Sequence, residues 1–196
     1  MKHFCDVAIS FTMICLLSPL FIIITITILL SQGRPIFFSQ YRVGKNRKLF
    51  RIFKFRTMHI KVGSENGSFD TGSNTRVTPL GVVLRTTKLD ELPQLFNVLA
   101  GHMSIVGPRP EIEKWSKVYS ERWDKVLKIK PGITDNASIE FRREEELLAH
   151  SKHPEETYKN LILPQKLDYY EKYVDDHSLI GDLVIIIKTI HVCVFK

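Results

Sequence analysis

Apolar residues run almost without interruption from Phe4 to Leu30, and Asp6 is the only charged residue among these 27 positions. A soluble domain of this size could hardly bury such a run, so the pattern predicts a membrane segment. The pair Ser18-Pro19 interrupts the run near its middle, where proline removes a helical hydrogen bond and bends the helix. A straight helix of this length would reach about 40 Å, enough to cross a bilayer.

Three interpretations of this segment compete. A cleaved signal peptide is disfavoured, because the run is too long, Asp6 lies in the region that should be basic, and no small-residue cleavage site follows. A single spanning helix is the default for such a run. A re-entrant helix that bends at Ser18-Pro19 and returns agrees with the basic flanks at both ends, because positive charge tends to stay cytoplasmic. The residues alone leave the last two interpretations open.

A helix with one buried face is predicted by four apolar residues spaced i, i+3, i+4 and i+7: Leu92, Leu95, Phe96 and Leu99. Pro93 is acceptable only in a first turn, so the helix should begin near Asp90. Asp90 or Thr87 can serve as its N-cap, and Gly101 stands where a left-handed residue would end it. This prediction places an adjacent carboxylate pair, Asp90 and Glu91, at the positive end of the helix.

The carboxylate pair has a structural and a functional interpretation. Acidic residues commonly cap helices and complement the helix dipole. Neighbours on a helix point about 100° apart, however, so one carboxylate could attack a substrate while the other binds a metal. The nearby cations Arg85, Lys88 and Arg109 would keep both carboxylates ionised and attract a phosphate. The local pattern leaves both interpretations open.

Basic residues alternate with aromatic and aliphatic ones after the apolar segment. The cations of this run are Arg42, Lys45, Arg47, Lys48, Arg51, Lys54 and Arg56. Over residues 51–58 the alternation approaches period two and predicts a strand, with Phe53 and Phe55 on one face. Lys54 and Arg56 would lie on the other face. Interleaved aromatics also suit nucleic-acid binding, but beside a membrane segment attraction to anionic headgroups is the commoner explanation. Lys54 and Arg56 could instead bind a diphosphate, and the pattern does not separate these roles.

The middle of the chain is less informative. Residues 61–78 are polar and rich in glycine and serine, which predicts a long loop. Residues 111–130 are predicted to hold a basic helix. Its aromatic face with Trp115 and Trp123 is more typical of a core than of a cofactor site, but it could also rest at a membrane interface. Residues 131–134 read as a turn.

The C-terminal third contains charged helices over residues 141–150 and 155–174, whose charges are most simply solvated faces. Residues 179–195 are apolar with few charges, which predicts an amphipathic helix lying in the membrane interface. The elements together predict an α+β, mostly helical fold with a small β element. Residues 1–32 would form the membrane anchor and residues 33–196 a second domain with interfacial helices.

Composition narrows the possible partners. The formal net charge of +7 and the pI of about 9.3 predict an anionic partner such as nucleic acid, acidic lipid or a phosphorylated substrate. Cys5, Cys15 and Cys193 show no regular spacing, so the sequence predicts neither a disulfide framework nor a zinc site. This cysteine usage suits a reducing compartment.

Four stretches together resemble the small monotopic phosphoglycosyl transferases, the bacterial initiating sugar transferases. They are the amphipathic start with Ser18-Pro19, residues 33–58, residues 85–111 and residues 130–134. The resemblance implies transfer of a sugar 1-phosphate from a UDP-sugar to undecaprenyl phosphate, the first membrane step of surface glycan assembly. It also implies a re-entrant anchor, so that residues 33–196 form a catalytic domain at the cytoplasmic face of the bacterial inner membrane.

The same resemblance implies roles for individual residues. Asp90 would be the nucleophile, forming an aspartyl phosphosugar and releasing UMP, and Glu91 would help to bind Mg²⁺ on the diphosphate. The cations expected at the donor phosphates are Arg85, Arg109, Lys54 and Arg56. The implied partners are the UDP-sugar, undecaprenyl phosphate, membrane lipid and downstream glycosyltransferases; no nucleic acid is expected.

Two positions depart from the family pattern. Cys5 precedes Asp6, where the family usually has an aromatic residue, and residues 135–138 differ from those of many larger members. The second departure bears on sugar specificity. The larger members carry further membrane spans that this sequence lacks, which leads us to expect the minimal catalytic unit.

Two other classes of protein remain as alternatives. The first is a membrane-anchored scaffold that holds anionic lipid or nucleic acid with its basic surface, while Asp90 and Glu91 merely cap a helix. The second is a metal-dependent glycosyltransferase of the ordinary nucleotide-sugar type. This class is disfavoured because no Asp-x-Asp motif follows an apolar strand.

Overall fold

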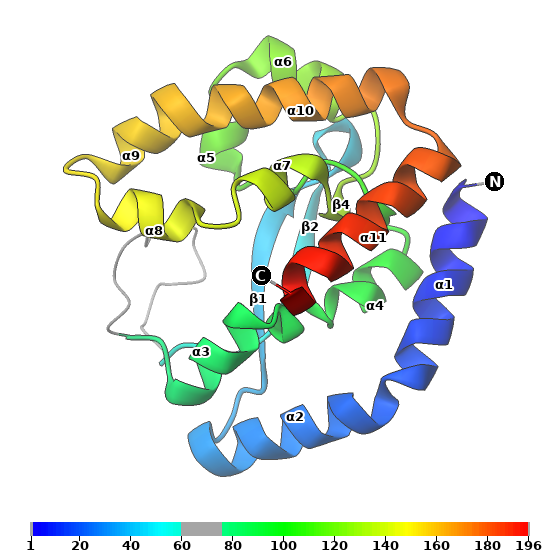
Figure 1. The fold of residues 1–196 in the computed structure, drawn as a ribbon, viewed down its shortest axis with the longest axis vertical. Coiled ribbons are helices and arrows are strands. Elements are labelled where there is room, and N and C mark those ends of the chain that lie inside the picture. The colour runs from blue at the N-terminus through cyan, green and yellow to red at the C-terminus, as the bar shows by residue number, and fades with distance from the viewer. Residues whose placement is uncertain (1, 60–75, 196) are drawn as a thin grey trace.

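The computed structural model describes residues 2–59 and 76–195. The fold of these residues is α+β and mostly helical with a small β element, as predicted, and that element consists of two two-stranded sheets (Figure 1). Most of the loop predicted over residues 61–78 lies outside the described residues.

Two helices open the chain, α1 (Lys2–Leu16) and α2 (Ser18–Gln32), and they are bent by 62° relative to each other. Pro19 lies in the first turn of α2, and Ser18 Oγ donates to the Cys15 carbonyl at 2.9 Å. The predicted break at Ser18-Pro19 is therefore confirmed. Within the described ranges no single helix combines the length and apolarity needed to cross a bilayer; only the bent pair meets that test jointly. Return to the side of entry stays a prediction.

The first sheet is an antiparallel hairpin of β1 (Phe37–Val43) and β2 (Leu49–Phe55), joined by the short turn η1 (Lys45–Arg47). The predicted strand thus starts earlier than residue 51 and ends before Arg56. The hairpin leads from the C-terminal end of α2 to α6 (Ser120–Val126), where Asn46 N donates to the Leu127 carbonyl at 2.7 Å (Figure 1). A seven-residue strand is about 23 Å long. The basic residues of the turn therefore lie far from α2.

The central helix is shorter than predicted. A 3₁₀ turn, η4 (Leu89–Glu91), carries both carboxylates, and α4 (Gln94–Leu99) begins after Pro93. Neither Asp90 nor Thr87 is an N-cap, because η4 follows Lys88 in a left-handed conformation without a side-chain cap, and Thr87 ends the preceding helix α3 (Pro79–Thr86). Gly101 does follow the helix with φ +78°, as predicted.

The buried face of α4 also differs from the predicted one. Phe96 is 42 % exposed and packs edge-on against Phe21 of α2, with ring centroids 5.6 Å apart. The buried positions of α4 are Gln94, Leu95, Asn97 and Val98. The prediction failed at Phe96 because polar residues occupy part of the face that lies against β2, and a hydropathy pattern reads such residues as exposed.

The second sheet joins β3 (Ser104–Val106) to β4 (Gly132–Thr134) in parallel. Residues 131–134 were predicted as a turn, and this prediction is corrected to a strand. The segments around Gly107 and Gly132 pass so close to each other that a Cβ on Gly132 would lie 2.1 Å from Gly107 N. Glycine is therefore required at this crossing.

The other helical segments of the described residues follow β3 in the sequence. The predicted helix over 111–130 is divided into α5 (Glu113–Ser116) and α6, and its Trp115 and Trp123 are buried core residues as expected. The segments that follow are α7 (Asn136–Glu140), α8 (Glu144–Ala149), α9 (Pro154–Thr157), the π-helical η5 (Tyr158–Ile162), α10 (Leu163–Asp176) and α11 (Leu179–Phe195).

Helix α11 has the bounds predicted for the amphipathic tail. Its exposed apolar side chains include Leu179, Ile180, Leu183, Val184, Ile187 and Ile190. Asp182 is buried instead, where it accepts from Tyr173 Oη at 2.6 Å and pairs with Lys2 of α1. Contact of the exposed face with a membrane interface stays a prediction.

Candidate active site

The turn η4 rests on helix α2. Leu89 and Leu92 flank the carboxylate pair and pack against a buried apolar cluster. The members of that cluster are Ile24, Ile28, Phe55 and Leu84. Burial of Leu89 and Leu92, on either side of Asp90 and Glu91, therefore holds the turn against α2.

Glu91 is bound by two cations from distant parts of the chain. Arg109 Nη2 and Nη1 lie 2.5 and 3.1 Å from Glu91 Oε1 and Oε2, and Lys54 Nζ lies 2.7 Å from Oε1. Such a two-point pair of guanidinium and carboxylate is among the strongest hydrogen-bonded arrangements in proteins. The Glu91 side chain is only 11 % exposed, so the pair is weakly screened by water.

The segment that carries Arg109 is held from both sides. Pro108 and Pro110 flank it, the Pro108 carbonyl accepts from Gly132 N at 2.9 Å, and the Pro110 carbonyl accepts from Arg42 Nη1 at 3.4 Å. The two prolines restrict the backbone. Arg109 is therefore presented to Glu91 from a rigid stretch.

The two carboxylates have different pKa values because their surroundings differ. Burial alone would raise the pKa of Glu91, but the charges and hydrogen bonds of Arg109 and Lys54 hold that pKa well below its usual range. Burial raises the pKa of Asp90, the charge of Glu91 raises it further, and Lys54 opposes both effects. Glu91 is thus a firmly ionised carboxylate, and Asp90 beside it is the more basic one.

Asp90 keeps an uncommitted oxygen. Lys54 Nζ is 4.0 Å from Asp90 Oδ2, beyond hydrogen-bond reach, and Asp90 Oδ1 is buried with no hydrogen-bond partner among the described residues. A buried acceptor without a partner is costly and usually marks a functional or ligand-binding position. The arrangement therefore provides one paired carboxylate and one that is available to react.

Four of the six predicted site residues meet here: Asp90, Glu91, Lys54 and Arg109. Arg56 does not reach them, because β2 ends at Phe55 and Arg56 turns to the end of α2. Arg85 lies in α3, and its guanidinium pairs with Glu145 of α8 at 2.5 Å.

Two further residues position the site and were not singled out from the sequence. Asn97 of α4 accepts from Phe53 N at 3.0 Å and donates to the Arg51 carbonyl at 2.7 Å, so it attaches α4 to the open edge of β2. Arg42 is attracted by the charge of Glu91 and repelled by that of Arg109. Burial lowers the pKa of Arg42. Arg42 and Lys54 lie on the same face of the paired strands β1 and β2, and this placement could have indicated Arg42 as a residue of the site.

A buried polar network lies behind Arg109. Tyr158 Oη donates to Glu111, Lys166 Nζ lies 3.9 Å from the same carboxylate, and Arg42 Nη1 lies 3.7 Å from it. Glu111, Tyr158 and Lys166 are all less than a tenth exposed. Through Glu111, the network connects the segment after Arg109 to α10 and the hairpin, and it thereby helps to hold that segment in place.

The residues of the site are compatible with magnesium. Mg²⁺ is usually held by one or two carboxylates together with water and substrate phosphates. No group of three or more His, Cys, Asp or Glu that could hold a metal occurs in the part of the chain that the structure describes. The buried free oxygen of Asp90 is a suitable hard donor. Glu91 could become a second ligand if a substrate phosphate took its place as the partner of Lys54 or Arg109.

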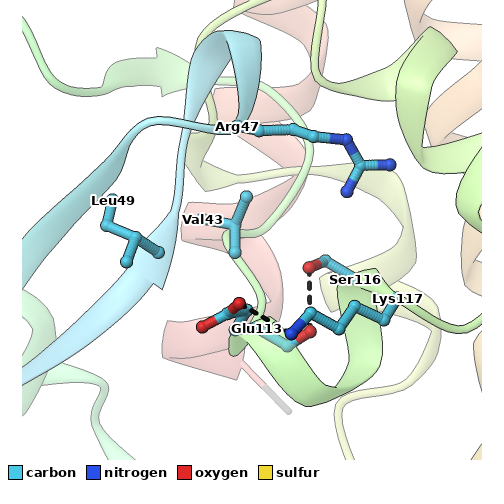
Figure 2. A pocket seen from close by; sticks show the side chains of 6 residues that line it. All are labelled: Val43, Arg47, Leu49, Glu113, Ser116 and Lys117. Atoms are coloured by element: carbon cyan, nitrogen blue, oxygen red, sulfur yellow. Dashed lines mark hydrogen bonds and ion pairs between the residues drawn. The ribbon is translucent and has the colours of Figure 1, made fainter.

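A hollow of about 240 Å³ lies away from the carboxylate pair, at the hairpin turn. Figure 2 shows its lining, which consists of Val43, Arg47, Leu49, Glu113, Ser116 and Lys117. Its charged groups are already paired: Arg47 with Asp124, and Lys117 with Glu113. The charges named here are therefore neutralised within the protein.

The sequence profile of a family described as bacterial sugar transferase matches residues 1–196, the whole chain. The exopolysaccharide production protein ExoY of Sinorhizobium fredii (strain NBRC 101917 / NGR234) is 33% identical over 209 residues, which cover 96% of this chain and 83% of that protein.

Two longer relatives are named by their reactions. The UDP-glucose:undecaprenyl-phosphate glucose-1-phosphate transferase of Klebsiella pneumoniae is 33% identical, over 96% of this chain and 39% of that protein. The UDP-N-acetylgalactosamine-undecaprenyl-phosphate N-acetylgalactosaminephosphotransferase of Aeromonas hydrophila is 32% identical, over 96% of this chain and 42% of that protein. The chain thus spans about two fifths of each of these two relatives.

Proposed function

The chain belongs to the bacterial sugar transferase family, and from that membership we propose that it moves a sugar 1-phosphate from a UDP-sugar to undecaprenyl phosphate. The relatives named above as transferases act on these two classes of substrate. The reaction would be the first membrane step of surface glycan assembly. Its product, a polyprenyl diphosphate sugar, is a substrate for downstream glycosyltransferases, which are the partners we expect.

One observation supports a covalent route above all others: Asp90 has a free, buried carboxylate oxygen directly beside the fully paired Glu91. Burial raises the pKa of Asp90, which makes its carboxylate a better nucleophile than an exposed aspartate would be. Glu91, in contrast, is ionised and occupied by two cations. The two adjacent carboxylates are therefore suited to different tasks.

In the proposed first step, an Asp90 oxygen attacks the phosphorus that bears the sugar. The bond from that phosphorus to the bridging oxygen breaks, and UMP leaves with the bridging oxygen. In the second step, a phosphate oxygen of undecaprenyl phosphate attacks the same phosphorus. The bond to Asp90 breaks, the carboxylate is restored, and the polyprenyl diphosphate sugar is released.

Lys54 and Arg109 are the cations we assign to the donor phosphates. Both already bind a carboxylate, so both are oriented toward anionic oxygens in the site. A diphosphate would compete with Glu91 for them, and their fixed charges would stabilise the charge that develops on the leaving UMP. Mg²⁺, if held by Glu91 and the diphosphate, would supply further neutralisation.

We place the enzyme at the cytoplasmic face of the bacterial inner membrane, with α1 and α2 as a re-entrant anchor. The support is the bend at Ser18-Pro19 together with basic residues at both flanks of the apolar run. Single cysteines placed before residue 4 and after residue 33, in a chain freed of Cys5, Cys15 and Cys193, should be labelled only from the cytoplasmic side. Labelling from opposite sides would establish a spanning segment instead.

The reaction is tested with membranes that contain the full chain, radiolabelled UDP-sugars, polyprenyl phosphate and Mg²⁺. We expect UMP release that requires Mg²⁺ and disappears in Asp90→Asn. Asp124→Asn, which removes an exposed carboxylate of α6, is the matched control and should retain activity. Full activity of Asp90→Asn would rule out covalent catalysis by this residue. The absence of UMP release with every donor would favour the scaffold alternative.

A further inference from the structure

The last residues of β2 and the one that follows point to three different parts of the molecule. Lys54 binds Glu91, and Phe55 is 1 % exposed in the apolar cluster between α2 and η4. Arg56 is 6 % exposed, and its Nη2 donates to the carbonyls of Gln32 and Gly33 at 2.6 and 2.9 Å. A single short stretch thus contacts both the carboxylate pair and the end of the second apolar helix.

The end of α2 provides the right partner for a buried cation. The last carbonyls of a helix lack helical donors and carry the negative end of the helix dipole. Gly33 continues the chain with φ +69°, and its N–H returns to the Leu29 carbonyl. The Arg56 side chain binds the carbonyls of Gln32 and Gly33, and the Arg56 backbone N–H donates to the Ile36 carbonyl at 2.9 Å. Arg56 therefore fixes the exit of α2 onto the hairpin.

From these contacts we propose that Arg56 is a positioning residue that holds the Asp90–Glu91 turn at a fixed level relative to the membrane helix α2. The inference rests on the proposed function, because the level matters only if the acceptor is a lipid. It assigns Arg56 a role distinct from the donor-phosphate binding that the sequence resemblance implied.

The two substrates should respond differently to a loss of this contact. The UDP-sugar is soluble and can approach Asp90 at any level. The phosphate of a polyprenyl carrier is confined to the headgroup region by its tail, so it meets the phosphosugar only if Asp90 lies at the matching level. A looser connection between α2 and β2 should therefore impair transfer to the lipid while sparing the reaction with the donor.

The experiment compares Arg56→Gln, Arg56→Lys and the matched control Arg51→Gln in the full chain, reconstituted in bilayers. Arg51 lies on the same strand, is exposed, and stacks on Tyr41 at 5.0 Å. Two quantities are measured: labelling of the protein by a UDP-sugar without acceptor, and KM for polyprenyl phosphate against KM for the UDP-sugar in turnover. A nitroxide attached at Lys88→Cys, in a chain freed of its three native cysteines, reports the depth of the turn in the bilayer.

For Arg56→Gln we expect labelling by the donor within twofold of the parent, a KM for polyprenyl phosphate raised about tenfold, and a shifted nitroxide depth. Arg56→Lys, which keeps the charge, should restore part of the acceptor KM, and Arg51→Gln should change none of the three quantities. An equal loss with donor and acceptor would make Arg56 a donor-binding residue and overturn the proposal. An unchanged acceptor KM and depth would also overturn it.

Failure of the proposed function has a different signature. If the parent protein itself is neither labelled nor active, the reaction is wrong, and the nitroxide depth alone then decides the role of Arg56. If Arg56→Gln does not fold, Arg56→Lys supplies the comparison, because an ammonium can still bind one of the two carbonyls.

Discussion

Replacement of Arg109 by methionine measures how much the ion pair at Glu91 stabilises the fold. Arg109 contributes both hydrogen bonds of a two-point contact, and among the described side chains only Arg109 donates to Glu91 Oε2. Methionine fills much of the same volume without charge. In Arg109→Met, Glu91 Oε1 keeps Lys54 at 2.7 Å, and Oε2 loses its cation.

The magnitude follows from burial. Glu91 is 11 % exposed and Arg109 is 30 % exposed, so water replaces the lost contact poorly. Removal of one partner from a buried ion pair costs roughly 3–5 kcal/mol. Since Lys54 still neutralises Oε1, we expect the lower end, about 3 kcal/mol of the free energy of unfolding. For a chain of this size this lowers Tm by about 6–12 °C.

The sign of the pH dependence follows from the depressed pKa of Glu91. A carboxyl whose folded pKa lies below its unfolded value stabilises the fold above the unfolded pKa, here 4.5. That stability is lost as the pH falls through the folded pKa. The difference between the parent and Arg109→Met should thus be complete at pH 7 and shrink as the pH is lowered below 4.5.

The assay is denaturant or thermal unfolding in one fixed detergent or nanodisc, at several pH values. Lys125→Met is the control, because Lys125 pairs at 2.7 Å with Asp175, their side chains are 40 % and 56 % exposed, and such surface pairs contribute about 1 kcal/mol or less. Because the pair with Arg109 is already lost, Glu91→Gln should cost at least about 1 kcal/mol less in Arg109→Met than in the parent. A cost below about 1 kcal/mol for Arg109→Met, or strictly additive costs in the double variant, would refute the reasoning.

Three other changes test the surroundings of the site. Gly132→Ala should prevent folding, because its Cβ would lie 2.1 Å from Gly107 N; a soluble, cooperatively unfolding variant in a detergent extract would contradict the close crossing. Asn97→Asp should cost about 2 kcal/mol in denaturant unfolding, because a carboxylate would face the Arg51 carbonyl that now accepts an N–H; an unchanged midpoint would contradict this contact. Asp90→Asn should raise Tm at pH 7 although it abolishes UMP release, because it removes a buried charge whose pKa is raised; a lower Tm would oppose this view of Asp90.

Features governed by local backbone chemistry could be predicted from the sequence. Proline near the middle of a long apolar run removes a helical hydrogen bond and bends the helix, so the bend at Ser18-Pro19 could be predicted from local chemistry. Gly101 ends α4 with a positive φ for a similarly local reason. The bounds of α11 followed from one segment that is apolar apart from Asp182, Lys188 and His191.

The central helix could not be predicted in the same way. Its pattern was interpreted as one α-helix, but Pro93 separates a 3₁₀ turn from a short helix. Asn97 is fully buried because its amide replaces a missing strand partner at the edge of β2. Phe96 is then left to contact α2 from the side. A buried amide that satisfies a distant backbone cannot be recognised from hydropathy alone.

The basic run shows how tertiary contacts decide the meaning of charge. The sequence pattern made attraction to lipid headgroups the commoner explanation for these cations, and it left Lys54 and Arg56 as candidates for a diphosphate. The structure separates them: Lys54 binds Glu91, Arg56 binds the end of α2, and Arg47 pairs with Asp124 at the far end of the hairpin. Alternation correctly predicted a strand, but the end of the strand at Phe55 decided that Lys54 and Arg56 have different partners.

The difference between the two carboxylates has a similar origin. Residue types alone make Asp90 and Glu91 interchangeable, and both could cap a helix. In a 3₁₀ turn successive residues point about 120° apart, so the two side chains face different surroundings. Glu91 meets Arg109 from 18 positions later in the chain and Lys54 from 37 positions earlier, whereas Asp90 is enclosed without a partner for one oxygen. Because Lys54 and Arg109 form their hydrogen bonds with Glu91, the buried Asp90 stays the more basic of the two carboxylates, which is the property that the proposed nucleophile requires.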